Sequence, residues 1–435
     1  MRVAVTLITA LAILSVNMSA QQPQVRQPLS LLDAIELGRK QGVEAAVSRL
    51  DVRAAEARTG ERRGELLPTI SGGASVTRQT LNLDEFGIPV ATGVTDAFNI
   101  YLLQLRASQT IFDASIITRL RAARDTAIAA GLDARAVGEL AGSTAGLAYL
   151  RVLSADETVR ARTADSVIAA DLLSQARRLV QTGVNPAIDA TRSEVSFAAV
   201  RNELEIARNT ADRARLDLVR ALDLPSESRL ELSDSLGFAP LQIPLNPDSA
   251  AAYARSHRAE LAAEHARTES ARHSLQSIRY ENLPSLSFNG LVNESGRRTG
   301  TLANSYTLRF LLNVPIFDGL RRQYRSKEQS ARVEIQEIRE RDVGNQVEVE
   351  ARQAVLDLAS AEQQMALAAE RVRLADRELS EAQARFRAGV AGSVETTNAQ
   401  SSVIAAQDAQ IQARVNYGTA RVSAYRALGV IDQLH

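Results

Sequence analysis

The sequence of 435 residues contains no cysteine and no tryptophan. Without cysteine there can be no disulfide, thiolate metal site, cysteine nucleophile or lipid anchor on an N-terminal cysteine. Aromatic residues make up only 4% of the chain, so its core cannot depend on the large rings that dominate ordinary cores. The net charge is zero, because 51 basic residues offset 51 acidic ones. This balance argues against nucleic acid as a partner.

Long apolar runs are scarce as well. One follows Arg2 and extends from Val3 to Val16, after which the sequence becomes polar at Gln21. This pattern predicts a secretory signal peptide over residues 1–20, cut after Ala20. Downstream, no apolar stretch approaches the ~18–20 residues of a spanning helix. If the mature chain enters a membrane, it must therefore do so as a β-barrel.

The chain repeats itself at an offset of about two hundred residues. The recurring landmarks are Leu67-Pro68 and Leu283-Pro284, Ile111-Phe112-Asp113 and Ile316-Phe317-Asp318, Gly183 and Gly389, and Arg220-Ala221-Leu222 and Arg426-Ala427-Leu428. Their common order predicts a first repeat over 21–223, a linker over 224–247, a second repeat over 248–430 and a tail over 431–435.

Both repeats are predicted to contain the same elements in the same order. Each has an opening helical segment (29–66, 249–282), two strands (68–79 and 99–112, 284–294 and 305–317), a long helix (114–182, 319–388), a glycine-containing turn (183–186, 389–392) and a second helix (187–223, 393–428). Each long helix would extend about 100 Å. An opening segment and a second helix, stacked end to end, match that length. Six helical segments can therefore build a rod four helices wide.

The long helices have narrow, alanine-rich seams, which favour close coiled-coil packing. Gly138, Gly142 and Gly146 lie four residues apart, and we expect this stripe to mark a tight helix crossing.

The predicted strands alternate between apolar and polar residues. In the last one, Tyr306, Leu308 and Phe310 share a face, opposite Thr307 and Arg309. This alternation is typical of membrane strands, although a sheet with one solvated face would look alike. Because the smallest membrane barrels have eight strands, four strands must be pooled between subunits. The predicted fold is mainly α with a β-barrel portion, and three copies would form a 12-strand barrel and a 12-helix tunnel.

Two pairs of residues recur at corresponding places on and beside the strands. Arg106 and Arg309, on polar strand faces, would line a barrel lumen or be buried in paired contacts. Asp113 and Asp318 follow each Ile-Phe pair, where a carboxylate can cap the first N–H groups of a helix. Capping is the favoured interpretation over catalysis, because no histidine or second acid repeats beside them.

No catalytic, nucleotide-binding or metal-binding motif stands out in the sequence. His257, His265 and His273 lie eight residues apart on one predicted helix, about 12 Å between neighbours, which is too far for two to bind one ion. We therefore expect no enzyme activity, no catalytic residue, no metal and no cofactor.

The chain resembles the TolC-like outer-membrane efflux proteins over nearly its whole mature length. The opening helix, the two Leu-Pro junctions, the strand-to-helix exit and the second turn carry the resemblance: Leu29-Ser30-Leu31-Leu32-Asp33-Ala34-Ile35, Leu66-Leu67-Pro68, Asn282-Leu283-Pro284, Val314-Pro315-Ile316-Phe317-Asp318-Gly319, Arg385-Phe386-Arg387-Ala388-Gly389, Glu395 and Asn398-Ala399-Gln400. It implies a homotrimer in the lipid of the bacterial outer membrane, with a long periplasmic extension. It also implies a passive export conduit that docks on a periplasmic adaptor and an inner-membrane pump.

The resemblance assigns roles to the two turns and their flanks. The docking surface would be Gly183, Val184, Asn185, Pro186, Gly389, Val390, Ala391 and Gly392, and the aperture gate would include Phe386, Glu395, Asn398 and Asp189. This chain departs from the family pattern in three ways: Asn398 replaces an aspartate, Phe386 lacks a hydroxyl, and Ala391 replaces a basic residue. We therefore expect a closed end held by fewer polar links than usual.

Two other interpretations account for part of the sequence. A periplasmic coiled-coil tether or adaptor without a pore explains the helices but leaves the amphipathic strands without a role. An enzyme is disfavoured because no catalytic constellation is present. Within the favoured class, drug efflux, metal efflux and type I protein secretion remain open.

Overall fold

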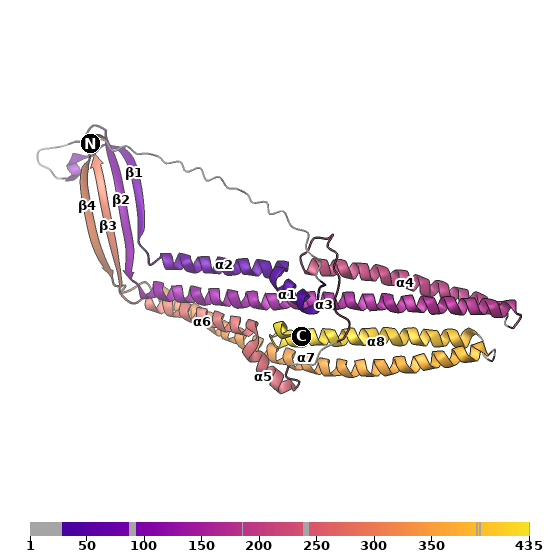
Figure 1. The fold of residues 1–435 in the computed structure, drawn as a ribbon. Helices are drawn as coiled ribbons and strands as arrows, with labels where there is room; N and C mark the ends of the chain where they lie inside the picture. Colours follow the sequence, from indigo (N-terminus) through magenta and orange to yellow (C-terminus); the bar gives the residue numbers. More distant parts are fainter. Residues whose placement is uncertain are drawn as a thin grey trace.

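The computed structural model describes residues 28–86, 93–184, 186–237, 243–388, 390 and 393–434. This part of the chain forms a long helical rod with a four-stranded sheet at one end (Figure 1). The predicted signal peptide at 1–20 lies outside the described residues. So do Asn185, Gly389, Ala391 and Gly392 of the predicted turns.

Two helices extend along the rod. They are α3 (Ala114–Gln181), with 68 residues, and α7 (Arg321–Arg387), with 67 residues. Neither contains proline, so no backbone N–H is missing along about 100 Å of helix. Shorter helices lie end to end along each: α1 (Leu31–Gln41), α2 (Val43–Gly64) and α4 (Ala187–Ala221) along α3, and α5 (Pro247–His257), α6 (Ala259–Tyr280) and α8 (Ser393–Ala427) along α7. This is the four-helix-wide rod expected from the lengths.

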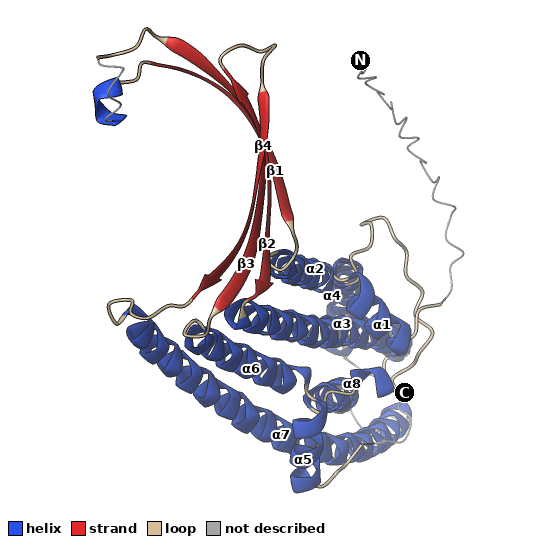
Figure 2. Ribbon diagram, turned by 90° about the vertical axis from the view of Figure 1, so that its left-hand side faces the viewer, coloured by secondary structure: helices blue, strands red, loops and turns tan. Residues whose placement is uncertain are grey.

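The lateral order of the helices leaves two free edges. Near the sheet the order is α2, α3, α6, α7 (Figure 2), and towards the far end it is α4, α3, α8, α7. The helix α3 is therefore central throughout, while α7 on one side and α2 and α4 on the other form the edges.

Each predicted opening segment is divided in two by an extended residue. Gly42 (φ −50°, ψ 139°) separates α1 from α2, and Arg258 (φ −68°, ψ 119°) separates α5 from α6. At both positions the N–H still donates to the preceding helix, to Gly38 at 3.1 Å and to Ala254 at 2.9 Å. The chain thus changes direction without leaving these N–H groups unpaired.

The glycine stripe of α3 makes the expected close crossing, with α1 as its partner. A Cβ added at Gly142 would lie 3.0 Å from the carbonyl oxygen of Ile35, and one at Gly146 would lie 3.0 Å from the Ile35 side chain. In the facing helix, a Cβ at Gly38 would lie 2.6 Å from that of Ala145. The two backbones therefore pack at a separation that larger residues would prevent.

The sheet is antiparallel, with its strands in sequence order and both outer edges unpaired within the described chain. One face carries most of the apolar residues of the four strands, and directly paired residues share a face. An example is the row Gly72, Leu105, Val292 and Tyr306. The strands are β1 (Thr69–Gln79), β2 (Phe98–Phe112), β3 (Ser285–Gly296) and β4 (Ala303–Asn313).

The last strand ends earlier than its predicted boundary at residue 317. Pro315 has no N–H to donate to a ladder, and the chain reaches α7 through Gly319 and Leu320, whose φ angles are +68° and +66°. In the first repeat Ala114 occupies the position of Gly319 and already begins α3. The helix after the strand therefore begins two residues later in the second repeat.

The main hydrophobic core lies at the waist of the rod, where the short helices meet end to end. It joins residues from both ends of the described sequence, including Leu29, Ile35, Tyr149, Leu218, Leu222, Val347, Val355, Tyr425, Leu428, Ile431 and Leu434. Two smaller clusters follow the α7–α8 seam towards the far end of the rod. A short 3-10 helix, η2 (Ile431–Gln433), packs against this core through Ile431. Another 3-10 helix, η1 (Leu83–Phe86), follows β1.

No helix in the described ranges has both the length and the apolar composition required to cross a bilayer.

Candidate functional site

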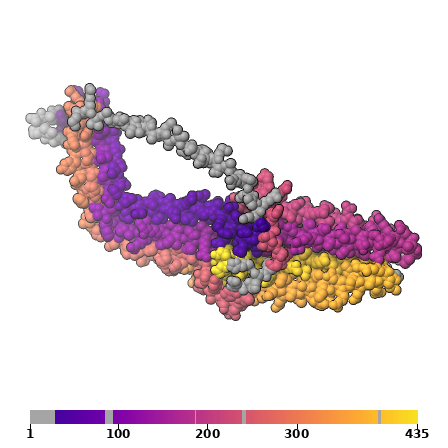
Figure 3. All heavy atoms as spheres, viewed as in Figure 1, coloured from indigo at the N-terminus to yellow at the C-terminus, as the bar shows by residue number. Residues whose placement is uncertain are grey.

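The two hairpin turns lie at the end of the rod farthest from the sheet (Figure 3). Gly183 has φ +75°, which a residue with a Cβ rarely adopts. Its N–H donates to Val180 at 3.1 Å, and that of Val184 donates to Leu179 at 3.0 Å. These two bonds satisfy the last carbonyls of α3 and turn the chain sharply. In the second hairpin the N–H of Val390 donates to Arg385 at 3.1 Å.

The four predicted gate residues have different environments. Phe386 is only 2% exposed and continues the α7 seam of Ala375, Leu379 and Ala382. Its ring therefore packs inside the α7–α8 hairpin. Asn398 is exposed on the first turns of α8.

The two acids among the predicted gate residues both have an arginine nearby. Glu395 is half-exposed, and its Oε1 lies 2.9 Å from Nη1 of Arg385 across the turn. Asp189 is buried in the first turn of α4, with the Arg192 guanidinium 3.9 Å away. The structure thus brings Arg385, which sequence reasoning did not select, beside a predicted gate acid.

The predicted lumen arginines lie on one face of the sheet. Arg106 is in the row that contains Ser71, Leu291 and Thr307. Arg309 pairs with Asn289, which lies two residues before Leu291 in β3 and therefore on the same face. Both side chains are exposed, and the structure gives neither an ion pair within the described chain.

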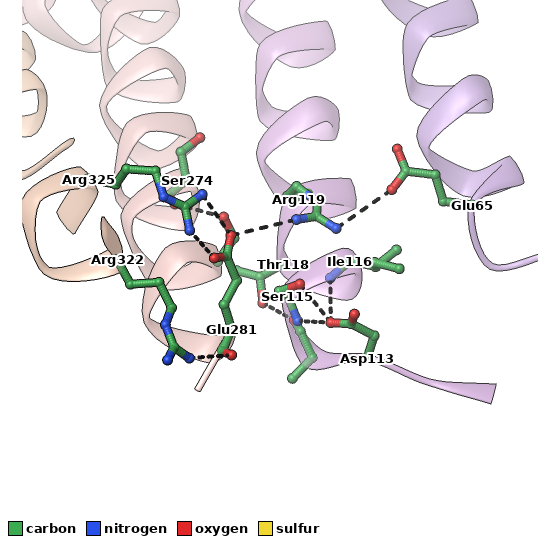
Figure 4. A network of polar contacts seen from close by, with 12 residues as sticks. Glu65, Asp113, Ser115, Ile116, Thr118, Arg119, Ser274, Glu281, Arg322 and Arg325 are labelled. Atoms are coloured by element: carbon green, nitrogen blue, oxygen red, sulfur yellow. Dashed lines mark hydrogen bonds and ion pairs between the residues drawn. The ribbon is translucent and has the colours of Figure 1, made fainter. Parts of the chain in front are cut away.

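At the junction of sheet and helices the two predicted cap residues behave differently, and Figure 4 shows the first of them, Asp113. The Oδ1 of Asp113 accepts bonds from the N–H groups of Ser115 at 2.8 Å and Ile116 at 3.2 Å, so Asp113 is the N-cap of α3. Asp318 is not the N-cap of α7, because Leu320 holds that position. Its Oδ2 nevertheless accepts from the backbone N–H and from Nε of Arg322, at 2.9 and 2.8 Å.

Glu281, at the end of α6, is the centre of the junction network in Figure 4. Its carboxylate pairs with Arg325 of α7, at 3.2 Å to Nη1, and lies 4.0 Å from Arg119 of α3. Its carbonyl accepts from Arg322 at 2.9 Å. Arg119 also lies 3.9 Å from Glu65, which follows α2. All four helices below the sheet are thereby connected by one set of charges.

A second polar connection crosses the middle of the far half of the rod. Arg162 of α3 donates to both oxygens of Asp408 of α8, at 2.7 and 2.6 Å, and to Asp165 at 3.1 Å. Burial raises the pKa of Asp165, although the Arg162 guanidinium acts in the opposite direction. No local pattern predicts this link, because 246 residues separate the partners along the chain.

The break between α5 and α6 is stabilised by a buried arginine. Arg258 donates to Glu260 at 2.9 and 3.1 Å, to Glu350 at 2.9 Å and to the carbonyl of Ala427 at 3.2 Å. Desolvation favours the neutral form of Glu260, but the bonds from Arg258 outweigh it and hold the pKa of Glu260 below its usual range. The arginine thereby connects the α5–α6 break to α7 and to the end of α8 at the waist.

The histidines form separate contacts. The Nδ1 of His265 lies 2.9 Å from Glu340, and that of His273 lies 2.6 Å from Asp125. Within the described ranges, no three His, Cys, Asp or Glu side chains gather as they would around a metal ion.

A groove of about 630 Å³ lies between α3, α4 and α8. Arg151 and Arg213 line it beside Glu203 and Asp217. Its wall therefore carries both signs of charge.

Comparison with known proteins gives consistent matches. The family model described as outer membrane efflux protein matches residues 35–223 and, again, 251–430. The chain is 27% identical over 425 residues to the pyoverdine export outer membrane protein OpmQ of Pseudomonas putida, covering 91% of this chain and 84% of the relative.

Two solved structures resemble most of the chain. The outer-membrane channel OprN superposes with a TM-score of 0.79 at 18% identity, covering 92% of this chain and 90% of that one. The CmeC outer membrane channel of Campylobacter jejuni gives a TM-score of 0.80 at 16% identity, covering 92% and 85%. These likenesses establish a shared fold.

Proposed function

Because the chain belongs to the outer membrane efflux protein family, we propose that it forms the outer-membrane conduit of a tripartite efflux or type I secretion system. It is a protein of the bacterial outer membrane, and its helical rod extends into the periplasm. In the proposal, three copies form a passive channel that receives cargo from a periplasmic adaptor and an inner-membrane pump.

The open sheet is the observation that carries this proposal. Within the described ranges, both β1 and β4 leave a row of backbone N–H and C=O groups unpaired, and each such group costs several kcal/mol in hydrocarbon. The apolar face of β4 presents Tyr306, Leu308, Phe310 and Leu312 in an exposed row, as a lipid-facing strand does. Pairing β4 of one copy with β1 of the next would remove the edges and, with three copies, give twelve strands.

The free edges of the rod support the same assembly. On α2, Val43, Val47 and Leu50 form an exposed stripe, and on α7 Ile335 and Ile338 do so. Exposed apolar stripes of this kind mark surfaces that a partner covers. Contact between α2 of one copy and α7 of its neighbour would close the rod into a tunnel as the sheets close into a barrel.

Within that assembly the polar face of the sheet would line the lumen. Two arginines in each copy, Arg106 and Arg309, would place six positive charges there in a trimer. We propose that they give the barrel a mild preference for anions. The aperture would lie at the other end, beside the hairpin ends that carry Glu395, Asn398 and Asp189, with Phe386 packed inside the α7–α8 hairpin. The two turns would dock on the adaptor.

Membrane extraction tests the proposal against a coiled-coil tether without a pore. Washing outer membranes with 1 M salt should leave the protein in the pellet, and detergent should release it as a trimer that conducts ions in a planar bilayer. Salt releases a peripheral tether, because screening removes its electrostatic contacts. Release by salt alone as a soluble monomer would contradict the conduit.

A further inference from the structure

The ends of the two hairpins present the same pair of exposed aliphatic side chains. Val184 and Ile188 lie beyond α3, and Val390 and Val394 occupy the corresponding positions beyond α7. They are 59%, 49%, 72% and 50% exposed, respectively. One exposed aliphatic residue is ordinary, but the same pair on both hairpin ends indicates a surface that contacts a partner.

Every acid within residues 177–194 and 385–395 lies beside an arginine of the same hairpin end. The pairs are Arg177 with Glu194 at 3.2 Å, Arg192 with Asp189 at 3.9 Å and Arg385 with Glu395 at 2.9 Å. The acids there therefore have little charge left to attract a cationic partner.

Two arginines at the hairpin ends have no acid beside them in the described chain. Arg178 bonds to Ser174 at 2.6 Å, and Arg387 bonds to Gln383 at 3.3 Å, each within its own helix. Residues 177–194 and 385–395 contain five arginines and three acids, which gives 5 − 3 = +2 per copy. The next acids, Asp171 and Glu381, lie further from the turns. Both arginines are exposed in the last turn of their helices, where a positive charge interacts favourably with the negative end of the helix dipole. That interaction does not cancel their charge.

We propose that the adaptor surface that meets the hairpin ends combines small apolar residues with carboxylates. This inference rests on the proposed function, in which the turns dock on a periplasmic adaptor, and adds the chemistry of the docking face. The four aliphatic side chains form the dry centre of the contact, and Arg178 and Arg387 form its charged rim. Charges at a rim mainly steer association, while the apolar centre slows dissociation.

The test uses the full-length trimer in detergent and two synthetic helical hairpin peptides of one design. The peptides differ only at the end turn, which carries either two glutamates or two lysines beside alanine and valine. Surface plasmon resonance at 50 and 300 mM salt should show binding of the glutamate peptide, with an association rate that falls as salt rises. The lysine peptide should bind at least about tenfold more weakly.

Variants separate the rim from the centre. The double variant Arg178→Gln/Arg387→Gln should associate with the glutamate peptide about tenfold more slowly and dissociate at an unchanged rate. Val184→Ser/Val390→Ser should accelerate dissociation. Arg121→Gln, which changes an exposed arginine near the opposite end of α3, is the matched control and should leave both rates unchanged.

Three results would overturn the inference: no preference for the glutamate peptide, an unchanged association rate in the double arginine variant, or no binding of either peptide. Bilayer conductance of the same preparation separates this failure from failure of the proposed function. A conducting trimer that prefers the lysine peptide refutes the acidic partner alone. A preparation that neither trimerises nor conducts refutes the conduit.

Discussion

Removing Arg162 should loosen the contact between α3 and α8 far more than removing its partner Asp408. Arg162 is 7% exposed and Asp165 is 2% exposed, whereas the Asp408 side chain is 45% exposed. The Arg162→Met change leaves Asp165 as a buried charge with no counterion, which costs about 3–5 kcal/mol. Asp408→Asn leaves Arg162 paired with Asp165 and removes a half-exposed charge, worth about 1 kcal/mol or less.

Protonation of Asp165 sets an upper limit on the destabilisation caused by Arg162→Met and makes that destabilisation depend on pH. An isolated buried Asp165 can bind a proton, at a cost of about 1.4 kcal/mol for each pH unit above the usual aspartate pKa of about 3.9. The limit is therefore about 4 kcal/mol at pH 7 and about 1.5 kcal/mol at pH 5. Burial already raises the pKa of Asp165 in the intact protein, so the destabilisation must shrink as pH falls.

Hydrogen–deuterium exchange along α8 measures this local opening in the full-length protein. Protection factors near Asp408 should fall by up to about a thousandfold in Arg162→Met at pH 7, and much less at pH 5. Arg160→Met, which breaks an exposed pair with Glu157 on the same helix, is the control and should change protection little. Adding Asp165→Leu to Arg162→Met should restore most of the protection, because no unpaired buried charge remains.

The reasoning is refuted if Arg162→Met leaves protection unchanged or if its effect is the same at pH 5 and pH 7. Equal effects of Arg162→Met and Asp408→Asn would also refute it. They would show that burial does not determine how much each charged side chain contributes to the stability of the α3–α8 contact.

Three further predictions concern other parts of the molecule. Leu308→Arg, on the apolar face of β4, should cost about 2–4 kcal/mol and lower the yield of trimer in lipid vesicles, while Thr307→Arg on the polar face should be tolerated. Gly38→Val should lower the melting temperature followed by circular dichroism, since its Cβ would lie 2.6 Å from an atom of α3; Gly60→Ala, where nothing lies within 4 Å, should leave it unchanged or raise it. Glu395→Ala should raise the conductance of the closed channel in bilayers, and an unchanged conductance would remove Glu395 from the gate.

The elements that sequence reasoning located well are those encoded by local periodicity. The long helices end within one or two residues of their predicted limits, because their seams and the absence of proline are properties of the segment itself. The glycine stripe of α3 identified a close crossing for the same reason. The alternation in β4 identified its two faces, although not its end.

What sequence reasoning missed depends on residues distant along the chain. Nothing local marks the break at Arg258, whose φ and ψ suit any residue and whose guanidinium is held by Glu350 and the carbonyl of Ala427. The different roles of Asp113 and Asp318 follow from a single glycine, which delays the helix in one repeat. Phe386 was selected as a gate residue from its position near the turn, but its burial depends on the seam formed with α8.

The waist core has a consequence for the order in which the protein folds. Leu29 and Ile431 belong to one cluster, so this core cannot close until almost all of the intervening chain has been delivered. Each helical hairpin, by contrast, needs only neighbouring residues and can form early. A chain stalled during secretion would therefore contain folded helical hairpins but no waist core. The apolar residues of that core would be exposed to quality-control proteases.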